Sequence, residues 1–229
     1  SGRQGLMARR RPPTVHGLAV IDKPAGVTSH DVVGMLRRRL GEKRVGHAGT
    51  LDPDATGVLL VGVGNCTRLL RFLTDLGKTY TGQVVFGSTT DSLDSTGVVT
   101  GTFDMSGLDP ALVQAMVTEH LTGAIEQIPP MVSAIKVGGK PLYKLARQGQ
   151  DIPREPRLVH IYTYKFSEYE EPFAYFRVSC TKGTYVRSLA HDLGQKLGCG
   201  AHLTRLRRLG SGRFDVADAT PLAEVLKWD

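Results

Sequence analysis

Apolar residues along the chain follow two spacings, and each spacing predicts one kind of secondary structure. Apolar side chains that alternate or run together over short stretches predict strands, at Leu18–Ile21, Val58–Val63, Thr79–Phe86, Arg157–Phe166 and Phe173–Cys180. Apolar side chains repeated every third or fourth position predict helices, at Asp31–Leu40, Thr67–Asp75, Pro110–Leu121, Tyr185–Leu197 and Leu222–Trp228. Because these elements interleave without a regular βαβ repeat, we expect an α+β fold with a mixed, mostly antiparallel sheet and flanking helices.

One stretch, Val45–Leu60, does not follow either spacing. It reads V-G-H-A-G-T-L-D-P-D-A-T-G-V-L-L and is interrupted by three glycines and a proline, which predicts a loop rather than a helix or central strand. Polar side chains are concentrated in it, and the apolar run Val58–Val63 follows directly. A polar loop held by a buried strand is a common support for a reactive side chain. The stretch is therefore the first candidate for a functional site.

Asp52 in this loop is open to three interpretations. It can act as a lone carboxylate, either as nucleophile or as general base. The segment D-P-D-A-T also matches an acidic D-x-D-x-T motif, in which Asp52 would be phosphorylated beside a magnesium ion. That motif should follow a hydrophobic strand, and Val45–Leu51 is too polar and too rich in glycine for one. The third interpretation is an Asp-Pro turn in which Asp52 caps its own backbone.

Charge favours a polyanionic partner. The 229 residues include 29 Lys and Arg against 22 Asp and Glu, a net charge of +7, while 41% of the residues are hydrophobic. This balance suits a folded protein that binds nucleic acid. We expect phosphate contacts from Arg37–Arg39, from the basic segment Leu203–Arg213 and from the lysines of a Pro- and Gly-rich flap at residues 129–156, which we expect to be mobile.

Composition also excludes several classes of protein. The cysteines Cys66, Cys180 and Cys199 form no C-x-x-C pair, so we expect a reducing, cytoplasmic compartment. There is no apolar run long enough for a membrane helix, no P-loop and no metal-ligand cluster, so we expect no membrane, no metal and no cofactor. Residues 1–16 are interpreted as a tag remnant followed by a basic arm, and residues 17–229 as one catalytic domain.

Four motifs carry a resemblance to a known family. They are D-K-P-A-G-V-T-S-H-D-V-V from Asp22, the G-H-A-G-T-L-D-P-D-A-T-G-V-L segment from Gly46, P-P-M-V-S-A-I-K-V-G-G-K-P-L-Y-K-L-A-R from Pro129, and K-G-T-Y-V-R-S-L-A-H-D-L-G from Lys182. In this order they resemble the TruB family of tRNA pseudouridine synthases, over residues 17 to 214. The resemblance implies the pseudouridine synthase fold and the isomerisation of uridine 55 in the T loop of tRNA.

The resemblance also implies roles for single residues. Asp52 would be the essential carboxylate, and Arg187 would pair with it; without the resemblance, Arg187 would be a phosphate contact or a surface pair. Tyr80 would stack on a flipped-out uracil and assist proton transfer at C5, whereas strand alternation alone indicates a half-buried tyrosine. Tyr185 and Leu206 would line the pocket. Without the resemblance, Leu206 would be interpreted as a residue of the hydrophobic core.

His47 and Lys23 have two interpretations each. By resemblance His47 contacts RNA near the flipped base; otherwise it braces the loop. Lys23 is expected either to brace the active-site loop or to contact phosphate.

The expected partner is the T stem-loop of tRNA, and the expected state is a monomer. Many family members carry a small RNA-binding PUA domain after the catalytic domain, and we expect none between the last motif and Asp229. Two other functions compete with the synthase. One is a non-catalytic RNA-binding module or tRNA chaperone, and the other is the magnesium-dependent phosphotransferase built on Asp52.

Overall fold

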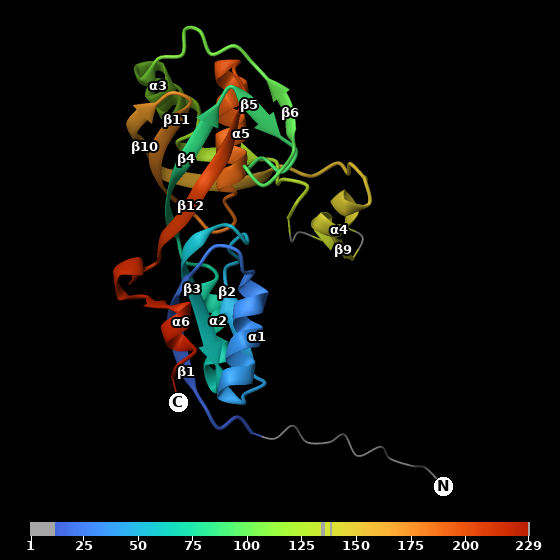
Figure 1. Cartoon of the computed structure of the whole chain (residues 1–229), viewed down its shortest axis with the longest axis vertical. Helices are drawn as coiled ribbons and strands as arrows, with labels where there is room; N and C mark the ends of the chain where they lie inside the picture. The colour runs from blue at the N-terminus through green and yellow to red at the C-terminus, as the bar shows by residue number, and fades with distance from the viewer. Residues whose placement is uncertain (1–11, 134–135, 138, 229) are drawn as a thin grey trace.

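The structure is a computed structural model that describes residues 12–133, 136–137 and 139–228. Its centre is a ten-stranded sheet with strand order β14-β1-β3-β12-β4-β11-β10-β7, to which β2 and β13 are attached (Figure 1). Most neighbouring strands are antiparallel, while β1–β14 and β12–β3 are parallel. This confirms the α+β fold with a mixed, mostly antiparallel sheet. The basic arm at residues 9–11 lies outside the described residues.

One half of the molecule, the β3 half, contains β1 (Gly17–Lys23), α1 (Ser29–Leu40), β2 (Val45–Ala48) and β3 (Thr56–Val63). Helix α1 begins where Thr28 and Asp31 form a reciprocal capping box, and it ends at Gly41 in the left-handed conformation. Its apolar face buries Val32, Val33 and Leu36. The periodicity of the sequence correctly predicted β1, α1 and the apolar part of β3.

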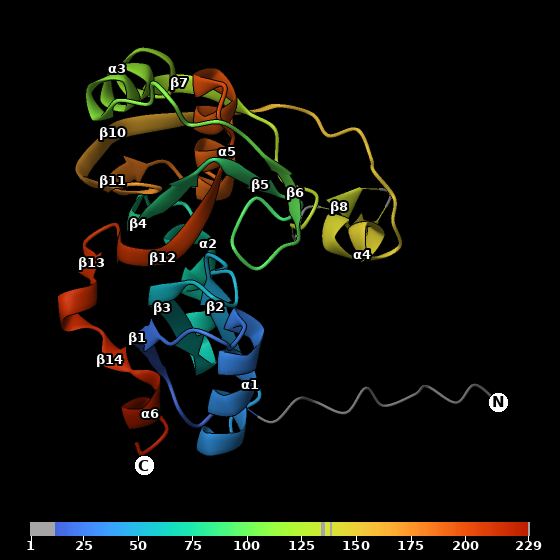
Figure 2. The same cartoon turned by 45° about the horizontal axis from the view of Figure 1, so that its top comes forward.

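The other half, the β4 half, contains the antiparallel strands β4 (Lys78–Phe86), β11 (Phe173–Cys180), β10 (Arg157–Glu170) and β7 (Gly123–Gln127). Helices α3 (Pro110–His120) and α5 (Val186–Leu197) contact each other and cover one face of this sheet (Figure 2). The buried side of α5 includes Val186, Leu189 and Leu193, as its spacing predicted. Among the described residues, Figure 2 shows no helix packed on the opposite face of these four strands.

Strand β12 (Ala201–Ser211) joins the two halves. It runs antiparallel to β4 over most of its length, and it pairs in parallel with β3 at Arg207↔Thr56 and Arg208↔Gly57 in the described chain. Gly57 has φ +105°, and a Cβ atom there would lie 2.1 Å from the carbonyl oxygen of Arg208. Glycine therefore permits the close backbone approach that links β3 to β12, which we call the seam.

The predicted loop at Val45–Leu60 is too long by several residues at each end. Val45–Ala48 forms β2, and β3 begins at Thr56, so the connection between them spans residues 49–55. The glycines mark close packing here rather than a break in the strand: a Cβ atom at Gly46 would lie 2.8 Å from a methyl group of Leu70. The predicted loop is too long because glycine also occurs within strands, at positions where a neighbouring side chain packs closely against the backbone.

The remaining elements are short. The predicted helix Thr67–Asp75 is a 3₁₀ segment, η1 (Gly64–Leu69), followed by one turn of α2 (Leu70–Leu73), and the last helix is α6 (Leu222–Val225). A small hairpin, β5 (Ser88–Thr90) and β6 (Val99–Thr102), lies beside α5 in Figure 1. The C-terminal elements are β13 (Phe214–Asp215), η2 (Val216–Asp218) and β14 (Thr220–Pro221).

The flap predicted at residues 129–156 stands beside the main body in both views (Figures 1 and 2). Its described part holds β8 (Lys136–Val137), β9 (Lys140–Pro141) and α4 (Leu142–Arg147), whose Leu142 and Leu145 are buried. Its mobility stays a prediction. Among the described residues, no helix has the length and apolar character needed to cross a membrane.

Candidate active site

A cavity of about 490 Å³ opens where the two halves meet. Its wall includes five of the seven residues predicted for the site, namely Asp52, Tyr80, Tyr185, Arg187 and Leu206. Asp52 comes from the β3 half, whereas the other four come from β4, α5 with its N-cap, and β12. The volume lies in the range of small-molecule pockets, about 300–1,000 Å³.

The loop that carries Asp52 is held on both sides of that residue. Leu51 is buried, and its amide and carbonyl both hydrogen-bond the hydroxyl of Ser29, at 3.0 and 3.2 Å. The carbonyl of Pro53 accepts a 2.9 Å bond from the amide of Gly26. Asp52 itself accepts through its backbone carbonyl from Ala55 at 3.0 Å. The carboxylate therefore projects from a fixed support.

Lys23 is fully buried at the end of β1. Its Nζ donates to three backbone carbonyls, those of Pro24, Val27 and Pro53, at 2.7, 2.8 and 3.0 Å. Burial lowers the pKa of Lys23 to about 8, against the opposing charges of Asp54 and Asp52. Since all three donors are used internally, this geometry favours the bracing role over the phosphate contact.

Arg187 faces Asp52 across the cavity. Its Nε lies 3.0 Å from Oδ2 of Asp52, and the arginine side chain is 5% exposed while that of Asp52 is 40% exposed. The guanidinium also donates to the carbonyls of Ser92 at 3.1 Å and Val132 at 2.8 Å. Three separate segments therefore fix its plane. A cation held this way pairs with the Asp52 carboxylate and fixes its direction at the edge of a partly closed pocket.

Two tyrosines line the same cavity. Tyr80 is buried on β4, and burial raises its pKa, although the charge of Arg208 works in the opposite direction. Tyr185 is the N-cap of α5, and Gln127 holds it by accepting from its amide at 2.9 Å and donating to its carbonyl at 3.1 Å. Burial raises the pKa of Tyr185 as well. Both phenols thus remain protonated and can donate hydrogen bonds to a bound base.

Leu206 reaches the cavity because β12 is irregular there. The pairing of β12 with β4 shifts register between Thr204 and Arg207, and Arg205 has φ +52°, which is uncommon for a residue with a side chain. A bulge of this kind redirects the neighbouring side chain. The sequence alone gave no signal for this bulge.

Arg208 and Lys78 also line the cavity, and the sequence did not single them out. Arg208 is 1% exposed; it donates to the carbonyls of Val58 at 2.8 Å and Gly49 at 2.9 Å, and it hydrogen-bonds the hydroxyl of Tyr80. Lys78 is buried and donates to the carbonyl of Leu76. Burial lowers the pKa of Lys78 to about 8. The cavity therefore has two buried cationic side chains besides Arg187.

These contacts narrow one prediction. The basic segment Leu203–Arg213 was expected to contact phosphates, but Arg208 is buried and Arg207 forms a two-bond ion pair with Asp22, at 2.8 and 3.0 Å. Arg205 and Arg213 are exposed, and phosphate contact by these two stays a prediction. A run of arginines in the sequence does not reveal that alternate residues of a strand face opposite sides.

His47 lies on β2, outside the residues that line the cavity. Its Nδ1 is buried and has no hydrogen-bond partner among the described residues, and burial lowers its pKa. Contact of His47 with RNA stays a prediction. In the described part of the chain, no cluster of three or more His, Cys, Asp or Glu residues is arranged to hold a metal ion.

Comparison with known families covers most of the chain. The family model described as TruB family pseudouridylate synthase, N-terminal domain, matches residues 37–186, and that of the tRNA pseudouridylate synthase B C-terminal domain matches residues 187–229. The chain is 50% identical over 211 residues to the tRNA pseudouridine synthase B of Syntrophotalea carbinolica, covering 92% of this chain and 69% of the relative. It is 48% identical over 209 residues to that of Opitutus terrae, covering 91% and 86%.

Solved structures give the same result. The crystal structure of a Cbf5-Nop10-Gar1 complex contains a chain with a TM-score of 0.73 and 30% identity, over 93% of this chain and 54% of that one. A structure of an H/ACA RNP bound to a substrate RNA containing 2′-deoxyuridine gives a TM-score of 0.69 and 28% identity, over 93% and 53%. The chain thus spans about half the length of these solved relatives. With both family models matched and identities near one half, the chain belongs to the TruB family of pseudouridylate synthases, and it is an isomerase.

Proposed function

We propose that this protein converts uridine 55 in the T loop of tRNA to pseudouridine, with Asp52 as the essential carboxylate. The observation that carries the proposal is the ion pair between Asp52 and the buried Arg187 on the wall of a cavity that also contains Tyr80. The two relatives named above are tRNA pseudouridine synthases B, which supports tRNA as the substrate.

The reaction exchanges one glycosidic bond for another. The C1′–N1 bond breaks, the uracil turns over, the C1′–C5 bond forms, C5 loses its proton and N1 gains one. A base inside a folded loop must be extruded before an enzyme can reach it. The cavity offers an extruded uracil the ring of Tyr80 for stacking and the phenols of Tyr80 and Tyr185 as hydrogen-bond donors.

The residues divide the work in this proposal. Asp52 reacts with the nucleoside, either as nucleophile or as base at the ribose. Arg187 orients the carboxylate, because its guanidinium is fixed by two backbone carbonyls besides Asp52. Tyr80 stacks on the uracil and assists the proton transfer at C5. Leu206 supplies apolar contact with the base.

The test is to incubate an unmodified tRNA transcript with Asp52→Asn and to map pseudouridine in the product. We expect turnover to fall by a factor on the order of 10⁴ or more, as for other essential reacting groups, while tRNA binding persists. Asp54→Asn is the matched control, since Asp54 is an exposed carboxylate in the same loop. Turnover by Asp52→Asn above contamination by wild type would contradict the assignment.

Two further outcomes separate the alternatives. Activity that persists in EDTA excludes the magnesium-dependent phosphotransferase. A tRNA chaperone would keep its effect on tRNA folding in Asp52→Asn, whereas the synthase would lose its product. Pseudouridine at a position other than 55 would support the chemistry and contradict the proposed target.

A further inference from the structure

A row of exposed side chains on β10 begins at the cavity. Val159 and Ile161 are buried against the helices, so Leu158, His160 and Tyr162 lie on the opposite, helix-free face of the sheet. Leu158 is 74% exposed and Tyr162 is 58% exposed. We call these three residues the β10 row. Large exposed apolar and aromatic side chains in a row are unusual unless something binds to them.

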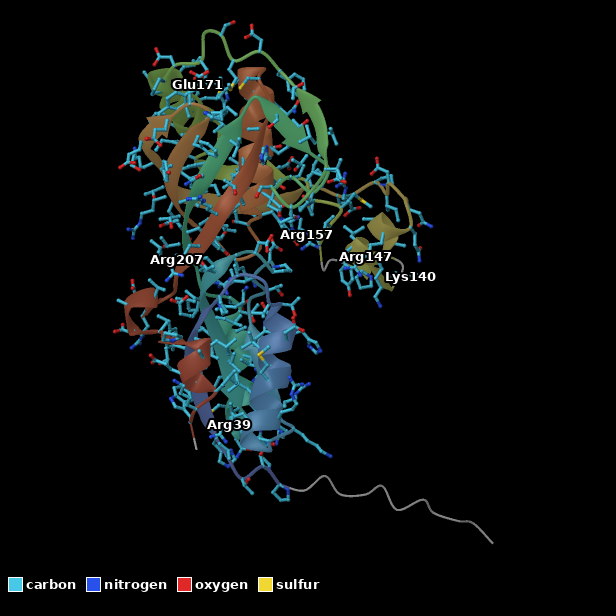
Figure 3. The ribbon with its side chains drawn as sticks, in the orientation of Figure 1. Arg39, Lys140, Arg147, Arg157, Glu171 and Arg207 are labelled. Atoms are coloured by element: carbon cyan, nitrogen blue, oxygen red, sulfur yellow. The ribbon has the colours of Figure 1, made fainter. Side chains whose placement is uncertain are left out.

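The β10 row is continuous with the active site. Leu158 is part of the cavity wall, together with Thr181 and Lys182 from the loop that precedes α5. Strand residues advance about 3.4 Å each, so the row extends roughly 14 Å from Leu158 to Tyr162. Figure 3 shows the course of the strand, from Arg157 beside the cavity to the turn at Glu171 at the far end of the sheet. A chain leaving the cavity along β10 would meet the row first.

The two aromatic rings of the row form a ready surface for stacking. The rings of His160 and Tyr162 have their centroids 4.8 Å apart, at an angle of 47°. Their mutual contact restricts the side chains before any ligand arrives, which lowers the entropy that binding must overcome. Bases stack on such aromatic side chains regardless of sequence.

Basic side chains lie beyond both ends of the row, while one acidic residue, Glu126 on β7, stands in register with Leu158. Lys165 and Arg177 face each other in register on β10 and β11, and both are exposed on the same open face. Lys182 lies at the cavity rim, where it pairs with Asp75. Cationic side chains beside aromatic ones are typical of single-stranded nucleic-acid sites, where they contact the phosphates between stacked bases.

We propose that the β10 row is a stacking surface for the unpaired nucleotides that adjoin the uridine held in the cavity. This inference rests on the proposed function, because it takes the cavity to hold a uridine of an RNA chain. The row would bind one or two flanking bases by stacking on His160 and Tyr162, while Lys165 and Arg177 neutralise the phosphates. It would thereby orient the RNA without reading its sequence.

The experiment uses the whole protein and short stem-loop RNAs that contain the target uridine, with 2-aminopurine at one flanking position at a time. Binding to wild type should quench the fluorophore at one or both of the positions next to the target. Tyr162→Ala should lose that quenching and raise the Kd about 5- to 100-fold, the range for one lost base–aromatic stack. Tyr162→Phe should retain both the quenching and the wild-type Kd, because the aromatic ring is kept.

The matched control is Phe173→Ala, because Phe173 is an exposed aromatic residue of the same sheet at the start of β11. It should bind as wild type does. Equal weakening by Phe173→Ala and Tyr162→Ala, or unquenched fluorophores at both flanking positions, would overturn the proposal. The titration reads binding only, so it is independent of turnover: quenching without pseudouridine formation would contradict the proposed function and leave the stacking surface supported.

Discussion

The two halves of the molecule contribute to the active site in different ways. The β3 half presents Asp52 on a loop whose backbone is fixed by Lys23 and Ser29. The β4 half presents Tyr80 and Arg187 from a regular strand and helix. The β3 half thus holds the Asp52 carboxylate by hydrogen bonds within the loop between β2 and β3, whereas the β4 half holds its side chains by the regular geometry of a strand and a helix. The comparison teaches that the geometry of the proposed site depends on the seam, which sets the distance between the two sets of groups.

Among the changes that test how the two halves act together, Arg187→Lys should have the largest effect. Lysine keeps the charge, but it cannot bond Asp52, Ser92 and Val132 in one plane. We expect kcat to fall by a factor on the order of 10²–10³, similar to the loss of one fixed transition-state contact. Single-turnover kinetics with saturating tRNA measures it. Arg157→Lys is the control on the same cavity wall, and kcat near wild type for Arg187→Lys would show that the two halves need no planar contact.

The seam itself can be tested with Gly57→Ala. The new Cβ atom would meet the Arg208 carbonyl, so the two halves must separate or shift, and we expect a loss of about 3 kcal/mol in the free energy of unfolding. Gly26→Ala is a matched control, because Gly26 has φ +89° and nothing within 4 Å of the added Cβ. Gly26→Ala should lower the free energy of unfolding by about 1–2 kcal/mol, the cost of placing a residue with a side chain in the left-handed conformation. Chemical denaturation measures both, and equal losses would show that the close approach at the seam adds nothing.

A smaller effect is expected from Arg208→Lys. Its guanidinium bonds the loop side at Gly49 and Val58 and the other half at Tyr80. Lysine cannot span all three, so Tyr80 and Asp52 should lose their mutual alignment, and we expect kcat to fall about tenfold. Arg207→Lys, whose ion pair with Asp22 lies outside the cavity wall, is the neighbouring control. If both variants lose activity equally, the effect is general destabilisation rather than alignment.

The smallest effect concerns RNA binding at the two ends of the molecule. Figure 3 shows Lys140 and Arg147 on the flap near Arg157, whereas Arg39 lies at the opposite end of the molecule. Arg147→Ala should reduce the slope of log K against log salt by about 0.7–0.9, the value for one phosphate contact. Phosphate contacts were expected from Arg37–Arg39, but Arg37 and Arg39 donate to the carbonyls of Val45 and Leu226, and α1 lies away from the flap (Figure 1). We therefore expect Arg38→Ala, on the exposed end of α1, to leave the slope unchanged. An equal reduction by Arg38→Ala would extend the RNA path over the β3 half.

The sequence predicted the elements whose apolar positions repeat regularly, such as α1, β10 and α5. It did not predict β2, because Gly46 makes room for Leu70 and thus resembles a loop residue. The combination of Asp52 with Arg187 came from the family resemblance, since the two residues are 135 positions apart and no local pattern connects them. Arg208 was not identified, because a buried arginine and a surface arginine look alike in a basic run.

The separation of Asp52 from Arg187 has a consequence for the synthesis of the protein. The pair is 135 residues apart in the chain, and ribosomes add about 5–20 residues each second, so Asp52 is made roughly 7–27 s before its partner. The β3 half can begin to pack during this interval. Its carboxylate, however, has no guanidinium opposite it until α5 has been synthesised and β12 closes the seam. The proposed pair can therefore form only after both α5 and β12 have been synthesised, when β12 joins the two halves.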